Sequence, residues 1–230
     1  MNFFQERMRW YKFQILNYLI VLFYSFIIMA APITHLFFAD KFCDKHWEID
    51  CFQFFSWNCL PDIRYIDKTV ERGKYHMKNL RIDDVLAEKS DFLKGVKFHS
   101  LVDEKRDSFY EEHNIYTPKF SDENFIKSLK FLEDDVLYWK LSFRQNFINF
   151  FNEYEFPIYD IDWKSIKKWK ILLSDYFREQ PCSESRKDFI LWIWLTEDTY
   201  NQIESKLNEA RQNNLQYIGD MVAFLENLIE

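Results

Sequence analysis

The sequence predicts an all-α protein, and two observations carry that prediction. Only 3 glycines and 5 prolines occur in 230 residues, whereas β-barrels and nucleotide-binding α/β folds use glycine at turns and phosphate loops. Apolar residues recur at spacings of three and four, and no segment shows the alternation of a half-buried strand. The GxGxxG and GxxxxGK[ST] loops are also absent. We therefore expect a multi-helix bundle with a long C-terminal helix.

Length and composition indicate one helical domain, residues 30–230, preceded by an apolar segment, residues 1–29. Hydrophobic residues make up 48% of the chain, enough for a sizeable core. The 37 acidic residues outnumber the 30 basic ones and give a net charge of −7, which disfavours a nucleic-acid partner. The four cysteines form no CxxC pair, so we expect buried, reduced thiols in a cytoplasmic protein.

The N-terminal segment allows several interpretations. The run from Phe13 to Ala31 carries no formal charge and follows three basic residues. Its length approaches the roughly 20 residues that cross a bilayer. It could be a helix packed on the domain, an extension upstream of a true start at Met29, a membrane anchor or a cleaved signal. The last two would make the protein membrane-anchored or exported.

The first elements of the domain are expected to be short. Thr34 is expected to cap a helix that continues to Phe42. Residues 52–57 form an apolar helical turn that ends before Pro61, because proline lacks the amide hydrogen that continues a helix. Residues 63–78 are expected to be loop or short helix.

Longer helices are expected in the rest of the chain, each next to a capping residue or a proline break. Their predicted ranges are 92–110 after Ser90 or Asp91, 122–154 after Ser121, 160–178, and 185 onward. The last segment is one long helix or a helical pair. Its apolar residues from Ile203 to Leu228, Leu215 among them, indicate a bundle seam, with a homodimer contact as the alternative.

Histidines and aspartates supply the candidate chemistry. His99 and Asp103 are four residues apart in a predicted helix, so they share one face and could bind one ion. Imidazole nitrogen and carboxylate oxygen are the ligands that zinc, iron and manganese prefer. A bound ion lowers the pKa of water towards about 7 and neutralises charge on a phosphoryl oxygen. Taken alone, such a pair is more often a surface or structural contact.

The order of several short motifs resembles the zinc-dependent phospholipase C family over about residues 30–110. Members of that family open with Pro-x-Thr-His-Leu, continue through Pro-Asp-Ile-Arg and Arg-x-x-x-His, and reach His-x-x-x-Asp after Phe-Leu-x-Gly. The matching residues are Pro32-Ile33-Thr34-His35-Leu36, Pro61-Asp62-Ile63-Arg64, Arg72 with His76, and Phe92-Leu93-Lys94-Gly95 followed by His99 and Asp103.

The resemblance implies a bundle of the phospholipase C/P1 nuclease type that acts as a metal-dependent phosphoesterase. It implies that Asp62, His76, His99 and Asp103 hold one ion. It also implies that His35 and Asp103 help to hold a second ion, and that Asp62 serves as the general base. The ion would be zinc, with manganese or iron as alternatives.

The chain departs from the family at other ligand positions. Members use a mature N-terminal Trp, but none lies next to Pro32, and His113 is the only later histidine. Glu133 and Asp134 lie in the one tempting carboxylate cluster, which could instead be a solvated helix face. We therefore expect one or two ions, with His113, Glu133 and Asp134 as additional candidate ligands. Gly95 is expected to allow close approach of a neighbouring helix.

A protein of net charge −7 needs local cations to attract a phosphate ester. Arg64, Arg72 and Lys74 are the candidate substrate-binding residues, because they lie near the proposed ligands in sequence. The substrate would be a phosphorylated small molecule or a lipid head group. The alternative function is a non-catalytic helical interaction protein or a membrane-associated protein, with membrane contact through residues 13–31.

Overall fold

The computed structural model describes residues 32–115, 122–141, 147–149, 151, 160–193 and 195–229. These residues contain helices and no strand, which confirms the all-α prediction. Among the helices of these ranges, none combines the length and apolar character that crossing a membrane requires. The predicted apolar segment, residues 13–31, lies outside the described residues.

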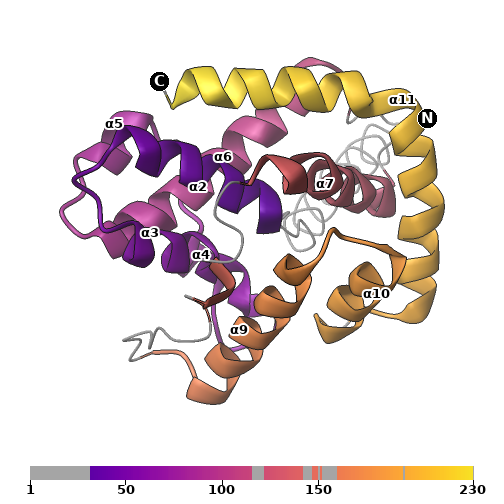
Figure 1. Ribbon diagram of the computed structural model, residues 1–230, viewed down its shortest axis with the longest axis horizontal. Coiled ribbons are helices and arrows are strands. Elements are labelled where there is room, and N and C mark those ends of the chain that lie inside the picture. The colour runs from indigo at the N-terminus through magenta and orange to yellow at the C-terminus, as the bar shows by residue number, and fades with distance from the viewer. Residues whose placement is uncertain are drawn as a thin grey trace, which may run out of the picture.

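The N-terminal elements pack into one group that will carry the candidate site. They are α2 (Pro32–Lys45), α3 (Cys51–Asn58), the 3-10 helix η1 (Leu60–Tyr65), α4 (Arg72–Tyr75), α5 (Ile82–Leu86) and α6 (Asp91–Glu112). Helix α6 contacts every other member of this group, most extensively α3 (Figure 1). Local sequence explains the boundaries: Asp50 accepts hydrogen bonds from two amides of α3, and Ser90 caps α6.

The C-terminal elements lie on one side of that group and extend above and below it in Figure 1. They are α7 (Glu123–Leu137), the 3-10 helix η2 (Tyr138–Lys140), α9 (Trp163–Arg178), α10 (Ser183–Trp192) and α11 (Glu197–Leu228). Helix α11 runs along one side of the molecule and then across its top, where it packs on α6 and α7 (Figure 1). The segment after residue 185 is thus a helical pair. Ile203, Leu207 and Ile218 are buried, which confirms the bundle seam, although Leu215 is exposed.

Three predicted details were wrong. Thr34 does not cap a helix but lies within α2, where its hydroxyl contacts Asp134. The predicted helix 122–154 is not continuous: α7 ends at Leu137, and Leu141 is extended after η2. Asp122 caps α7 by accepting from Asn124 N, whereas Ser121 lies outside the described residues.

Gly95 sets the distance between the two most closely packed helices of the N-terminal group. A Cβ at this position would lie 2.3 Å from the carbonyl oxygen of Phe54 and 3.0 Å from the amide nitrogen of Asn58. No side chain fits there without moving backbone, so the prediction of close helix approach is confirmed. The consequence is that α3, which contacts the candidate site through Asn58, is held directly against α6.

The cysteines only partly match the prediction. Cys43 and Cys59 are buried, but Cys51 is half-buried and Cys182 is exposed; all four are free thiols. Burial raises the pKa of Cys59 well above its ordinary value, so that thiol is unreactive.

Candidate metal centre

Five predicted ligands from four separate segments meet at one place in the molecule. Helix α2 supplies His35, η1 supplies Asp62, the residue that ends α4 is His76, and α6 supplies His99 and Asp103. All but His76 are buried, and the His76 side chain is itself only 6% exposed. We call these five residues the His/Asp cluster. They form two overlapping triads able to hold an ion, His35–Asp62–His99 and His76–His99–Asp103.

The spacing of the ligand atoms matches a tetrahedral ion site. His99 Nε2 lies 3.2 Å from His76 Nε2, 3.5 Å from Asp103 Oδ2 and 3.9 Å from Asp62 Oδ2. His76 Nε2 lies 3.6 Å from Asp62 Oδ1 and 3.9 Å from Asp103 Oδ2. Ligands that each lie 2.0–2.1 Å from a tetrahedral zinc ion are about 3.4 Å from one another. The triad His76–His99–Asp103 therefore fits one small divalent cation, and Asp62 lies beside both histidines.

His35 approaches the same aspartate from the other side. Its Nε2 lies 3.3 Å from Asp103 Oδ1, and its ring stacks on the His99 ring at 3.9 Å between centroids. Arg106 Nη2 lies 3.0 Å from that same Asp103 oxygen. A guanidinium already neutralises this oxygen, so the geometry favours one ion at Asp103 Oδ2 over a second ion shared with His35.

Asn58 orients two members of the His/Asp cluster. His99 Nδ1 lies 2.8 Å from the Asn58 carbonyl oxygen, which only accepts, so Nδ1 carries the proton. This tautomer leaves the lone pair of Nε2 directed at the other ligands. The Asn58 side-chain amide in turn donates to the His35 carbonyl at 2.8 Å and joins α3 to α2.

Ser100 positions His76, which follows the short helix α4. The Ser100 hydroxyl accepts from Met77 N at 3.0 Å, and its one proton is shared between the carbonyls of Tyr75 at 3.2 Å and Val96 at 3.1 Å. Both residues that flank His76 are therefore fixed to α6, one turn from the other ligands. Sequence analysis did not identify Asn58 or Ser100, because their contacts are made through backbone atoms that no motif encodes.

The electrostatics favour a neutral His99 imidazole and ionised Asp62 and Asp103 carboxylates, the forms that bind metal. Burial, followed by the charge of His35, lowers the pKa of His99 well below its ordinary value. Burial acts to raise the pKa of Asp103, but Arg106 and then His35 outweigh it and hold the pKa well below the usual range. Asp62 follows the same pattern, with its pKa lowered by His76 and His99 against the effect of burial.

Several buried atoms of the His/Asp cluster make no hydrogen bond of good geometry within the described residues. They are both ring nitrogens of His35, Nδ1 of His76, Oδ1 of Asp62 and both carboxylate oxygens of Asp103. Buried polar atoms usually have a partner, because each unsatisfied one costs about 1–3 kcal/mol. A concentration of such atoms around the His76–His99–Asp103 triad fits a divalent cation at this point.

The additional candidate ligands are not part of this centre. His113 is exposed at the end of α6, where its ring stacks on Phe109 and its Nδ1 lies 2.8 Å from the Phe109 carbonyl. Glu133 and Asp134 are fully buried, so the solvated-face alternative was wrong. They belong to a second cluster of polar side chains, which we call the Glu133–Asp134 network.

The carboxylate oxygens of the Glu133–Asp134 network accept hydrogen bonds from neighbouring residues. Thr34 N donates to Asp134 Oδ1 at 3.0 Å, and the Tyr176 hydroxyl donates to Asp134 Oδ2 at 3.1 Å. The Tyr110 hydroxyl donates to Glu133 Oε1 at 3.0 Å. Burial raises the pKa of both carboxyls, that of Asp134 the further. These carboxyls are structural acceptors in the described fold.

A cleft of about 350 Å³ opens next to the His/Asp cluster. Its lining includes His76 and Asp103 and one of the three predicted substrate-binding residues, Arg72. Nη1 of Arg72 is buried without a hydrogen bond among the described residues. By contrast, the Arg64 guanidinium lies 4.2 Å from the Tyr65 ring centroid, and Lys74 Nζ pairs with Asp160 at 2.7 Å.

No family model matches this chain, and no curated protein or solved structure is significantly similar to it.

Proposed function

We propose that this protein is a metal-dependent hydrolase that acts on phosphate esters. The observation that supports it is the triad His76–His99–Asp103, whose atoms lie at the mutual distances of ion ligands, with Asp62 from a third element beside both histidines. When bound, a divalent cation supplies a Lewis acid that activates water and neutralises charge on a phosphoryl oxygen. Zinc suits this ligand set best, with manganese and iron as alternatives.

The residues of the His/Asp cluster and the cleft have separate roles in the proposed reaction. His99 presents a neutral Nε2 because Asn58 holds the proton on Nδ1. Asp62 acts as a ligand more than as a general base, since a base needs a pKa near the working pH and its pKa is lowered. Arg72, at the edge of the cleft, offers guanidinium hydrogens to a phosphoryl oxygen.

The cleft suggests a compact polar substrate. Besides Arg72 and Lys78, its lining carries the carboxylates of Asp103, Glu104, Asp107 and Glu111. This excess of negative charge would repel a phosphate ester, so anion binding depends on the ion and on Arg72 together. Removal of either should therefore weaken substrate binding.

Phosphate release from a chromogenic phosphate monoester and diester tests the proposal. The full-length protein should be inactive after treatment with chelator and should regain activity with zinc or manganese. Arg72→Lys should raise KM more than it lowers kcat, whereas Lys74→Ala, which removes a cation paired with Asp160, should change neither. A folded protein that hydrolyses neither ester with any added ion would contradict the proposal.

One observation favours a second candidate function, a non-catalytic helical interaction protein. The pairing of Arg106 with Asp103 at 3.0 Å already places a cation against one oxygen of the His/Asp cluster. In that case the cluster would be a buried polar core without ion binding. The protein would then keep its fold and stability unchanged when metals are removed.

A further inference from the structure

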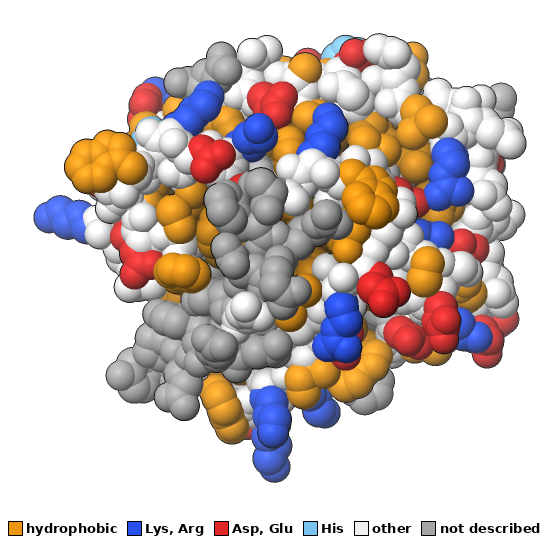
Figure 2. All heavy atoms as spheres, viewed as in Figure 1, with side chains coloured by type: hydrophobic (Ala, Val, Ile, Leu, Met, Phe, Trp, Pro, Cys, Tyr) orange, Lys and Arg blue, Asp and Glu red, His pale blue; other side chains and the backbone are white. Residues whose placement is uncertain are grey.

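Helix α9 presents an unusual mixture of side chains on its outer face. Five of its exposed residues recur at helical spacing on one side, and the exposed indole at the end of α10 lies beside them. This α9–α10 face consists of Trp163, Lys164, Lys167, Lys168, Ile171 and Trp192. Figure 2 shows hydrophobic and basic side chains next to one another along the lower edge of the molecule, where α9 lies.

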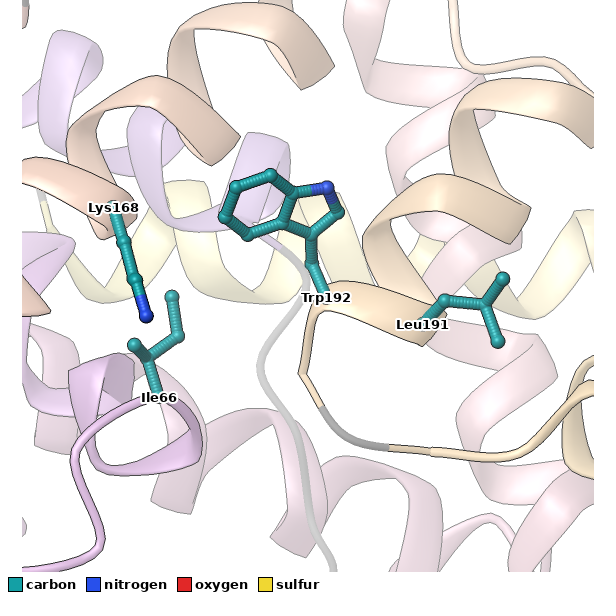
Figure 3. A pocket seen from close by; sticks show the side chains of 4 residues that line it. All are labelled: Ile66, Lys168, Leu191 and Trp192. Carbon is teal, nitrogen blue, oxygen red and sulfur yellow. The ribbon is translucent and has the colours of Figure 1, made fainter.

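The exposed apolar area on this face is substantial. Trp163 is 52% exposed, Ile171 41% and Trp192 45%, and no hydrophobic partner covers them within the described part of the chain. A pocket of about 420 Å³ lies between α9, α10 and the end of η1, lined by Ile66, Lys168, Leu191 and Trp192. In Figure 3, Ile66 and Lys168 face the Trp192 indole across this opening.

The charge of the face differs from that of the whole protein. Lys164, Lys167 and Lys168 make no ion pair among the described residues, although the chain carries a net charge of −7. Of the nearby acids, Asp162 caps the Ser165 amide at 3.3 Å and Asp175 pairs with Arg178 at 3.0 Å. The α9–α10 face itself carries three lysines and no carboxylate, so it presents a local excess of positive charge.

We propose that the α9–α10 face binds the surface of an anionic lipid bilayer. Tryptophan combines an apolar ring with a polar NH and prefers the boundary between water and hydrocarbon. Lysine side chains lay their methylene stems along apolar groups and keep the ammonium at the lipid head groups. The pocket beside Trp192 gives room for one acyl chain, with Lys168 placed to meet its head group.

This combination distinguishes a bilayer from other anionic partners. A nucleic acid or an acidic polypeptide would be attracted by the lysines but would leave Ile171 and the apolar pocket exposed to water. A bilayer covers both kinds of side chain at once, because anionic head groups and hydrocarbon lie within a few ångströms of each other. The proposal does not depend on ion binding at the His/Asp cluster.

Sedimentation of the full-length protein with vesicles tests the proposal. We expect the protein to bind vesicles of phosphatidylcholine containing phosphatidylserine much more tightly than vesicles of phosphatidylcholine alone, and to be released by salt. Lys164→Glu/Lys167→Glu should weaken the binding by at least about 25-fold, since each lysine near an anionic membrane contributes about fivefold. Trp163→Ala/Trp192→Ala should also weaken it, with circular dichroism confirming the fold.

Two matched variants control for charge and for exposed aromatic area. Lys89→Glu/Lys140→Glu changes the net charge equally at exposed positions away from α9, and Trp47→Ala removes an indole that is 89% exposed in the α2–α3 loop. Both should bind like the wild type within about twofold. Equal losses in the matched variants, unchanged binding in the α9 variants, or binding to RNA or an acidic polypeptide instead of vesicles would each overturn the proposal.

Discussion

Two buried polar clusters lie close together in this protein and differ in how their atoms are satisfied. In the Glu133–Asp134 network, hydroxyls of Tyr110 and Tyr176 donate to the carboxyls. In the His/Asp cluster, both oxygens of Asp103 lack a well-formed hydrogen bond. Arg106 touches both, at 3.0 Å from Asp103 and 3.7 Å from Glu133. Judged by residue type alone, either cluster could be a metal site. The hydrogen bonds distinguish them: the carboxyls of the structural network have donors, whereas the Asp103 oxygens of the ligand set lack well-formed ones among the described residues.

The largest effect is expected for the residue that both ion triads share. His99→Ala should reduce ester turnover by at least about 10³-fold, because metal-ion catalysis contributes several kcal/mol. Turnover and zinc affinity should fall together, as measured by kinetics and calorimetry. Asp134→Asn is the control and should leave both unchanged. Equal losses in the two variants would show that the clusters act as one site.

A substitution in the Glu133–Asp134 network should lower the stability of the protein. Glu133→Ala removes the acceptor of the Tyr110 hydroxyl and a neighbour of Arg106. Breaking such a buried pair should lower the free energy of unfolding by about 3–5 kcal/mol, measured by urea denaturation. Zinc affinity should change little. Loss of zinc binding with unchanged stability would instead place Glu133 among the ligands.

Lys130 is a buried cation between Arg106 and the carboxylates of Asp103 and Glu133. Its Nζ is buried without a hydrogen bond among the described residues, and burial, reinforced by Arg106, lowers its pKa from 10.5 to about 8. The unfolded state therefore binds the extra proton between these values, so stability should rise as the pH increases from about 8 to 10.5.

Below pH 8 Lys130 is protonated in both the folded and the unfolded state, so burial of its ammonium lowers the free energy of unfolding by the full amount. Lys130→Met should therefore stabilise the protein at pH 7 by on the order of 3 kcal/mol and remove the rise in stability at alkaline pH. Denaturation curves measured across that range check both effects. A destabilised variant would show that Nζ has a partner.

A smaller effect is expected for a residue that positions a ligand. Ser100→Ala removes the hydroxyl that fixes Tyr75 and Met77 on either side of His76. Zinc affinity should fall about 10- to 100-fold, as is typical when an outer partner of a ligand is lost. Ser56→Ala is the matched control, since among the described residues this buried hydroxyl bonds only to the Phe52 carbonyl of its own helix. Equal losses would contradict the positioning role of Ser100.

Sequence patterns predicted the helical class, but spacing alone paired only His99 with Asp103. The resemblance to the zinc-dependent phospholipase C family named all five members of the His/Asp cluster. Gly95 was also predicted, since a scarce glycine inside a helix indicates close backbone approach. The end of α7 at Leu137 was missed because the apolar pattern continues past the break. Burial of Glu133 and Asp134 was missed because their partners, Thr34 and the tyrosines, come from distant segments.

Metal analysis of the full-length protein, purified without chelator, tests the central claim most directly. The proposed site predicts about one divalent ion per chain, because the triad His76–His99–Asp103 supplies three ligands to one ion and leaves a position for water. His99→Ala should carry none while its circular dichroism stays the same. A wild-type protein that is folded, contains no metal and takes up no zinc, manganese or iron on titration would contradict the account.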